Sequence, residues 1–296
     1  MGLTYDCTRF MLAAREGGVS FGRMLTLGRQ WCRLDRSKMK TLWSRRGYPG
    51  IEHVADEGAW ADDIFKALGA DRLEVTDYSP YEGADVIHDL NLPVPSTHHD
   101  AYDVVFDGGV LEHVFNYPMA VENCMRMVRE GGHVIIASIA NNELGHGFYQ
   151  FSPELFFRLF SKANGYRVRS MVLVEAKLFG SSWYHVMDAA ALGARVCCIS
   201  HSPLHILVLA QRIGPVPEHL DVQQADYVQA WDEVKRTEKP EAEVRLVEKA
   251  TLKQRVVNSM PMRWRRRLEH IYRYCWVTRL YNRRFFRRIH KDRFTI

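Results

Sequence analysis

Residues 102–136 read YDVVFDGGVLEHVFNYPMAVENCMRMVREGGHVII, and this stretch decides the fold class. It starts with an apolar run, Asp103 to Phe106, and leads into a second one, His133 to Ser138. Between the two runs apolar residues recur at helical spacing, and Gly131-Gly132 follows where that pattern stops. A strand, a helix closed by glycine and a second buried strand are typical of a parallel sheet covered by helices.

The same alternation continues on both sides of this stretch. Runs rich in Val, Ile and Leu predict further strands at Arg23 to Leu27, Arg72 to Thr76, Asp85 to Ile87, Tyr166 to Val174 and His205 to Gln211. Ser152-Pro153-Glu154 predicts a helix start, because Ser caps helix N-termini and Pro fits the first turn. After Gly214 the pattern changes, so we expect an α/β domain over residues 1–214 and a helical basic extension over residues 215–296.

The net charge of +5 is unevenly divided along the chain. Residues 263–293 carry twelve Lys or Arg and two acidic residues, a balance of +10, which leaves −5 for the remainder. Such an extension could lie on an anionic membrane surface through residues 261–296 or associate with another subunit. Nucleic acid is the less favoured partner.

The rest of the composition limits the class of protein. The content of 47% hydrophobic residues excludes a disordered chain, and six cysteines without CxxC spacing indicate reduced thiols. Charged residues interrupt every apolar run that could form a signal peptide or a membrane span. We therefore expect a cytoplasmic protein, with a position peripheral to the membrane as the alternative.

Ligands of open α/β sheets bind at the carboxyl ends of the strands, so the residue after each predicted strand is a candidate. These residues are Gly28, Asp77, Asp89 and Asp107. Glycine lets the backbone approach a ligand, and a carboxylate after the second strand can accept hydrogen bonds from ribose hydroxyls. Each has a structural alternative, a packing glycine or a turn residue, but as a set they suit an adenosine-containing ligand.

Residues 72–168, and most specifically residues 102–136, resemble class I S-adenosylmethionine-dependent methyltransferases. Within them GHGFYQFSPELF, residues 145–156, is similar to methyltransferase type 11-like bacterial proteins associated with surface-glycan or secondary-metabolite pathways. The resemblance covers about residues 20–214. It implies a Rossmann-like fold with a seven-stranded, mostly parallel sheet of order 3-2-1-4-5-7-6, to which the pattern after Gly214 adds the C-terminal helical extension.

The resemblance also implies S-adenosyl-L-methionine as cofactor and S-adenosyl-L-homocysteine as product. By matching positions, it puts Gly28 in the cofactor loop and Asp77 at the ribose. Asp89 with Leu90 would bind the adenine, and Asp107 with Gly108 would lie near the methionine part.

The loop after the first predicted strand departs from the family pattern. Residues 25–34 read LTLGRQWCRL and keep only Gly28 of the usual G-x-G-x-G. Arg29 or Gln30 is expected to supply the contacts that glycine amides normally make. The link from Gly28 to Arg72 is also roughly twice the usual length. A non-catalytic binding or scaffold protein that has lost the cofactor therefore remains an alternative.

Methyl transfer to a hydroxyl requires in-line placement of the reactants and removal of a proton, for which histidine is the suited base near neutral pH. The candidates are His113, beside Glu112, and His146, in a loop after the fifth core strand, with Tyr149 as an orienting group. The alternatives are histidines that only hold their loops. No complete ligand set is seen, so no metal is predicted.

The expected function is O-methylation of a sugar, glycan precursor or small metabolite. An RNA methyltransferase that uses the basic extension is a further alternative.

Overall fold

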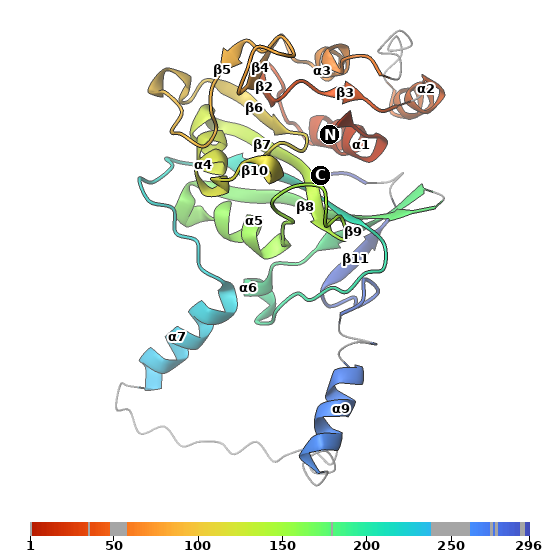
Figure 1. The fold of residues 1–296 in the computed structure, drawn as a ribbon, viewed down its shortest axis with the longest axis vertical. Coiled ribbons are helices and arrows are strands. Elements are labelled where there is room, and N and C mark those ends of the chain that lie inside the picture. The colour runs from red at the N-terminus through yellow and green to blue at the C-terminus, as the bar shows by residue number, and fades with distance from the viewer. Residues whose placement is uncertain are drawn as a thin grey trace.

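A mixed sheet of nine strands forms the centre of the molecule, with helices on both faces (Figure 1). The computed structural model describes residues 2–34, 36–47, 58–178, 180–237, 261–272, 275, 278–290 and 294–296. The strand order is β11-β9-β8-β10-β7-β6-β2-β4-β5. In chain order these strands are β2 (Arg23–Leu27), β4 (Arg72–Asp77), β5 (Val86–Ile87), β6 (Tyr102–Asp107), β7 (Val128–Asn141), β8 (Tyr166–Lys177), β9 (Gly180–Val186), β10 (Leu204–Arg212) and β11 (Phe286–Ile289).

The prediction of a seven-stranded sheet is therefore wrong in strand number. The expected order 3-2-1-4-5-7-6 is found only as the part of the sheet that runs from β5 to β8. β2, β4, β5, β6 and β7 pair in parallel, and β10 lies antiparallel between β7 and β8. Beyond β8 the chain adds β9 by a hairpin and β11 from its C-terminal part, both antiparallel. The fold class is α/β and Rossmann-like.

Alternating side chains of the parallel strands enter two apolar cores on opposite faces of the sheet. Val105 joins the core under one helical layer, while Val104 and Phe106 join the other. The first face is covered by α4 (Tyr117–Met127) and α5 (Pro153–Leu159), and the second by α1 (Tyr5–Glu16), α2 (Arg36–Arg45) and α3 (Asp62–Ala67). The three-layer arrangement accounts for the apolar runs of the sequence, because strands covered on both faces need no polar side.

The segment between β6 and β7 differs from the single helix that its apolar spacing predicts. A short 3-10 helix, η3 (Leu111–His113), comes first, and α4 begins only at Tyr117. Pro118 fits the first turn of α4 because its missing N–H is not needed there. The glycine pair does not close this helix: Gly131, with φ +81°, lies inside the long strand β7. Glu112 and His113 therefore lie on η3, a separate turn between β6 and α4.

The N-terminal residues cross the sheet edge. β1 (Gly2–Leu3) pairs in parallel with β3 (Trp31–Cys32), directly after the β2 loop. Thr4 then caps α1, its side chain accepting a hydrogen bond from the Cys7 N–H at 3.3 Å. These contacts hold the start of the chain against the carboxyl ends of the central strands.

The C-terminal part of the chain is not purely helical. After α6 (Ala189–Leu192) and β10, the helices α7 (Ala225–Thr237) and α9 (Met262–Tyr272) project from the lower end of the molecule in Figure 1. The chain then returns to the sheet as β11. Within the described residues, every helix is too short or too polar to cross a lipid bilayer.

The final residues pack into the body of the protein. Phe294 is buried, stacks on Phe10 of α1 with ring centroids 5.9 Å apart, and meets Trp183 of β9 edge-on at 5.2 Å. The carbonyl of Phe294 accepts a hydrogen bond from Arg46 at 3.2 Å. The end of the chain therefore contributes to the core of the second face.

We expect Phe294→Ala to lower the free energy of unfolding by about 3 kcal/mol, because it removes a buried ring from two aromatic contacts. Urea denaturation of the full chain measures this change. Phe115, whose side chain is 74% exposed, is the matched control, and Phe115→Ala should cost less than about 0.5 kcal/mol. Equal stability of the two variants would show that the C-terminus is not docked.

Candidate functional site

Parallel pairing brings the predicted site residues of β2, β4 and β6 to one edge of the sheet. Leu27 is in register with both Thr76 and Asp107, so the residues that follow these strands are neighbours. Gly28 has φ +62°, and a Cβ built on it would lie 3.8 Å from Asp77 Oδ2 and 3.2 Å from Val110 Cγ2. The backbone at Gly28 therefore requires glycine and faces the Asp77 carboxylate, as a cofactor loop would.

Arg29 and Gln30 both turn toward the protein. Arg29 forms an ion pair with Asp62 at 2.6 Å and lies over the Trp60 ring at 5.0 Å. Gln30 is buried and donates from Nε2 to the carbonyls of Leu27 and Gly28, at 2.9 and 3.2 Å. These contacts hold both side chains of the loop against the protein. Contact of either side chain with a cofactor stays a prediction.

Gly108 lies directly against the side chain of Gln30. A Cβ on Gly108 would come within 2.2 Å of Gln30 Oε1, so a larger residue here would displace the Gln30 amide. That oxygen is buried and has no hydrogen-bond partner among the described residues. Gln30 thus places an unused acceptor at the end of β6.

Asp77 and Asp89 each make the turn contacts that the sequence left open. Asp77 Oδ1 accepts a hydrogen bond from the Ser79 N–H at 3.3 Å. Asp89 Oδ1 accepts from the backbone and side-chain nitrogens of Asn91 at 2.9 and 2.7 Å, which lowers the pKa of Asp89. Leu90 is buried, and its carbonyl accepts from Asn123 at 3.3 Å. Their ribose and adenine roles stay predictions.

Asp107 is a buried carboxylate at the end of β6. Its Oδ1 accepts three backbone N–H bonds, from residues 109 to 111 at 2.8 to 3.3 Å, and so holds the start of η3. Its Oδ2 is buried without a partner among the described residues. Burial raises the pKa of Asp107 to about 6 against the opposing effect of the backbone hydrogen bonds.

Glu112, His113 and His146 come together from two segments that are distant in the sequence. Glu112 is fully buried; its Oε2 accepts from Ser138 Oγ at 2.9 Å, and its Oε1 lies 3.7 Å from His146 Nε2. Neither Oε1 nor Nε2 has a hydrogen-bond partner in the described part of the chain. The rings of His113 and His146 are 5.1 Å apart. Tertiary structure thus joins both predicted histidines to a carboxylate.

Burial dominates the electrostatics of this cluster. Burial, with a smaller contribution from the charge of Asp107, raises the pKa of Glu112 to about 8. It also lowers the pKa of His113, with a smaller contribution from the charge of His146. Perturbed groups of this kind, next to one another at the ligand edge of an α/β sheet, are typical of functional sites.

The loop that carries His146 is tied to Glu112. The backbone nitrogens of Phe148 and Tyr149 donate to the Glu112 carbonyl at 2.8 and 3.2 Å. A Cβ on Gly147 would lie 2.8 Å from that same carbonyl oxygen, so the close approach requires glycine. The Tyr149 hydroxyl donates to the carbonyl of Phe115 at 2.6 Å, and its orienting role stays a prediction.

The same three side chains could hold a divalent cation. Among the residues that the structure describes, they are the one group of three His, Cys, Asp or Glu whose ligand atoms all lie within 4.8 Å of one another. Two imidazoles and a carboxylate suit transition metals. The sequence alone predicts no metal, because the approach of His146 to Glu112 arises only in the tertiary structure.

Sequence reasoning missed the contribution of the N-terminus to this edge. A narrow cavity of about 50 Å³ is lined by Gly2, Thr4, Asp6 and Cys7 on one side and by Gly108, Ser138 and His205, with neighbouring strand residues, on the other. Ser138 also hydrogen-bonds Glu112, so the cavity adjoins the carboxylate cluster. Nothing in the spacing of residues 2–7 signals this role, because it arises from the pairing of β1 with β3.

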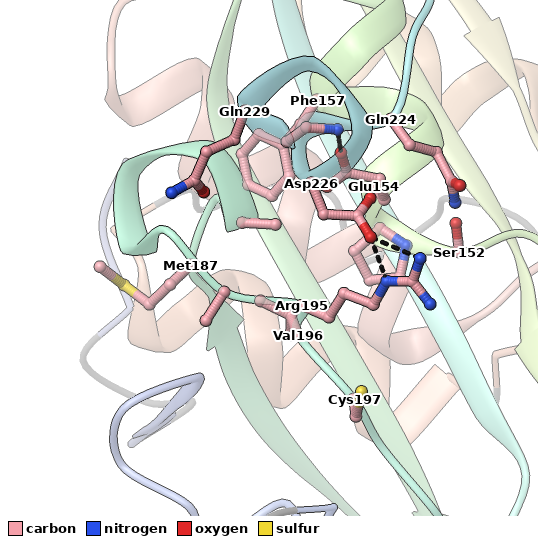
Figure 2. Close-up of a pocket in the computed structure, with 14 residues that line it drawn as sticks. Ser152, Glu154, Phe157, Met187, Arg195, Val196, Cys197, Gln224, Asp226 and Gln229 are labelled. Carbon is pink, nitrogen blue, oxygen red and sulfur yellow. Dashed lines mark hydrogen bonds and ion pairs between the residues drawn. The ribbon is translucent and has the colours of Figure 1, made fainter. Parts of the chain in front are cut away.

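A second cavity, of about 180 Å³, lies at the starts of α5 and α7 and contains none of the predicted site residues (Figure 2). Figure 2 shows Arg195 turned toward Asp226, with which it forms an ion pair, and Glu154 Oε1 accepting a hydrogen bond from the Ala225 N–H at 2.9 Å. Arg195 and Glu154 therefore already have polar partners in residues 225 and 226, at the start of α7. The volume of this cavity is below the roughly 300 Å³ of small ligand sites.

Comparison with known proteins gives only weak similarities. No known protein family and no curated protein matches the chain. Among solved structures, the branched-chain polyamine synthase of Thermus thermophilus, in complex with 5′-methylthioadenosine, is 14% identical over 74% of this chain, with a TM-score of 0.38. This chain spans 58% of the length of that enzyme.

Two further structures are methyltransferases with bound S-adenosylhomocysteine. The 1,6-didemethyltoxoflavin-N1-methyltransferase of Burkholderia thailandensis is 13% identical, covers 71% of this chain and 78% of its own, and has a TM-score of 0.39. The trans-methyltransferase CalH is 12% identical, covers 70% of this chain and 57% of its own, and has a TM-score of 0.37. TM-scores this low carry no argument, so the site must be judged on its own geometry.

The buried Glu112 makes a prediction about stability and pH. Its pKa is about 8 in the folded chain and near 4.5 when unfolded, so the folded state binds the extra proton between these values. This group therefore makes stability fall as pH rises from about 5 to 8, by at most about 1.4 kcal/mol per pH unit. Glu112→Gln cannot ionise, and its free energy of unfolding should fall less steeply over this interval.

Urea denaturation at several pH values, with a chelator present, measures the two slopes. Glu130→Gln, at an exposed position, is the control and should keep the parent slope. Parallel pH profiles for Glu112→Gln and the parent chain would contradict the buried, protonated state of Glu112.

Proposed function

We propose that this chain is an S-adenosylmethionine-dependent methyltransferase that methylates a hydroxyl of a sugar, glycan precursor or small metabolite. The observation that carries the proposal is a set of buried acceptors at the carboxyl edge of the sheet that have no hydrogen-bond donor among the described residues: Gln30 Oε1, Asp107 Oδ2 and Glu112 Oε1. Buried acceptors are costly when unpaired, so their presence at the ligand edge favours a ligand that brings donors or positive charge.

S-adenosylmethionine has the chemistry that these residues would satisfy. Its ammonium and ribose hydroxyls are donors and its sulfonium is cationic, whereas the residues that face the edge are acceptors. Asp77 would take the ribose hydroxyls, Gly28 would allow close approach, and Asp89 with Leu90 would border the adenine. When bound, the cofactor supplies an electrophilic methyl group. The buried acceptors therefore fit this cofactor although the glycine-rich loop is reduced.

His146 is the residue best placed to take the proton of the acceptor hydroxyl. Its Nε2 faces Glu112 Oε1 at 3.7 Å, in a loop that is fixed on the Glu112 backbone. An ionised Glu112 would stabilise the positive charge that forms on a neighbouring base during proton transfer, and a protonated Glu112 would not. Because the pKa of Glu112 is about 8, we expect methyl transfer to rise between pH 7 and 9. His113, whose lowered pKa keeps it neutral, is the second candidate for contact with the acceptor.

Two other functions are tested by the same measurements. A binding or scaffold protein of this fold would bind neither the cofactor nor its product. An RNA methyltransferase would bind both and transfer the methyl group to RNA. The arrangement of Glu112 and His146 favours an acceptor that must lose a proton, which supports the O-methyltransferase.

Cofactor binding is tested by titration calorimetry with S-adenosylmethionine and S-adenosylhomocysteine. We expect both to bind, and Asp77→Ala to weaken binding by about tenfold or more, because a ribose hydroxyl pair loses its acceptor. Asp63→Ala is the control, since Asp63 is 61% exposed and pairs with Lys66 on α3. Absence of heat with either compound at millimolar concentration would overturn the enzyme proposal.

The role of His146 is tested by transfer of a labelled methyl group to a panel of hydroxyl acceptors. His146→Ala should lower turnover by about 100-fold or more while cofactor affinity is kept, because proton transfer is lost but the binding edge is intact. His99→Ala, in a loop before β6, is the matched control. Full turnover by His146→Ala would remove this residue from the mechanism.

A further inference from the structure

A cavity rich in arginine lies at the far edge of the sheet, where β11 pairs with β9. It has a volume of about 550 Å³ and is lined by Tyr184, Leu280, Tyr281, Arg283, Phe286, Arg287 and Arg288. This volume is within the range of ligand sites. None of the proposed cofactor or catalytic residues lines it, so it is separate from the carboxyl-edge site.

The positive charge of this cavity is not neutralised within the described part of the chain. Arg283, Arg287 and Arg288 are exposed, and no ion pair or hydrogen bond joins their guanidinium groups to another described residue. The segment from Arg279 to Ile289 contains five arginines and no acidic residue. Glu175, which accepts from the Tyr184 hydroxyl at 3.3 Å, is already paired with Lys177 at 3.1 Å. The cavity therefore favours an anionic ligand.

The helix before this cavity exposes an apolar face. In α9, the side chains of Leu268, Ile271 and Tyr272 are 48%, 56% and 58% exposed. Their spacing of three and four residues places them on one side, with Arg266 opposite. Figure 1 shows α9 below β11, at the same end of the molecule. An exposed apolar stripe beside arginines is typical of helices that lie in a membrane interface.

We propose that this end of the protein binds the surface of an anionic phospholipid membrane. Lipid phosphates enter the cavity between Arg283, Arg287 and Arg288, while the apolar face of α9 rests among the headgroups. Arginine recognises phosphate by paired N–H donors, and the tyrosines Tyr184 and Tyr281 suit the interfacial region. The inference does not depend on the proposed methyl transfer.

Two other occupants of this surface are less well matched. RNA would use the arginines but gains little from exposed aliphatic side chains such as Leu268 and Ile271. A second copy in a symmetric dimer would bring two patches of like charge together, which is repulsive. Only the lipid surface uses both the arginines and the apolar face of α9.

The test is sedimentation of the full chain with vesicles of phosphatidylcholine alone and of phosphatidylcholine mixed with phosphatidylglycerol. We expect binding to the mixed vesicles, little binding to the neutral ones, and a decrease as salt is raised. The double variant Arg283→Gln/Arg288→Gln should bind the mixed vesicles at least about tenfold more weakly, since each arginine near the surface contributes roughly fivefold. A second variant, Leu268→Ser/Ile271→Ser, should lose the binding that persists at high salt.

The control for charge is Lys66→Gln/Lys162→Gln, which removes two exposed lysines elsewhere on the surface and should bind like the parent chain. Circular dichroism verifies the fold of each variant. Equal binding to both kinds of vesicle, or equal loss in the arginine and lysine variants, overturns the proposal. The proposal is also overturned if the arginine variant keeps vesicle binding but loses binding of a single-stranded RNA, or loses dimer formation in ultracentrifugation.

Discussion

The parallel register between β2 and β6 is the constraint on which the candidate site depends. It sets Leu27 beside Asp107, so the loop at Gly28 and the start of η3 meet at one edge of the sheet. If the register of β6 shifted by one residue, Val105 and Phe106 would each point to the opposite face of the sheet and leave their own core, because successive side chains of a strand point to opposite faces. Burial of the two apolar faces thus fixes the position of the polar groups.

Two of these polar groups, Asp107 and Glu112, are buried in an apolar environment that disfavours them. A protonated Glu112 and a half-paired Asp107 would each be more stable in water than in the core. Asp107 is held there by local hydrogen bonds from three backbone amides, and Glu112 by a tertiary contact with Ser138. The two apolar cores stabilise the fold. The carboxyl edge of the sheet carries buried polar groups whose protonation and hydrogen bonding a ligand can change.

The C-terminal extension contributes both to an apolar core and to the sheet. Phe294 contributes a buried ring to the core under α1, and β11 completes the sheet at the edge far from the loop at Gly28. Arg287 and Arg288 are thereby presented on β11, and Arg283 on the turn before it. The acidic part of the chain thus carries the candidate active site, and the basic extension carries the proposed membrane contact at a separate place in the structure.

The sequence by itself determined the fold class and the candidate edge. Apolar runs alternating with helical periods predicted the parallel core. Gly28 follows β2 as expected, whereas Asp77 and Asp107, expected directly after their strands, are the last residues of β4 and β6. The sequence did not predict β11, because a four-residue strand among arginines is recognisable only once β9 offers it a partner. Nor did it predict that η3 stands apart from α4.

Only the tertiary structure decided how the chemical groups combine. Glu112 and His146 are separated in the sequence by the helix α4 and the strand β7, and their 3.7 Å approach depends on the loop that hydrogen-bonds the Glu112 carbonyl. Burial of Glu112, and with it the raised pKa, follows from packing on both sides of η3. Local sequence sets the elements because backbone preferences are local, whereas desolvation and side-chain pairing depend on residues distant in the chain.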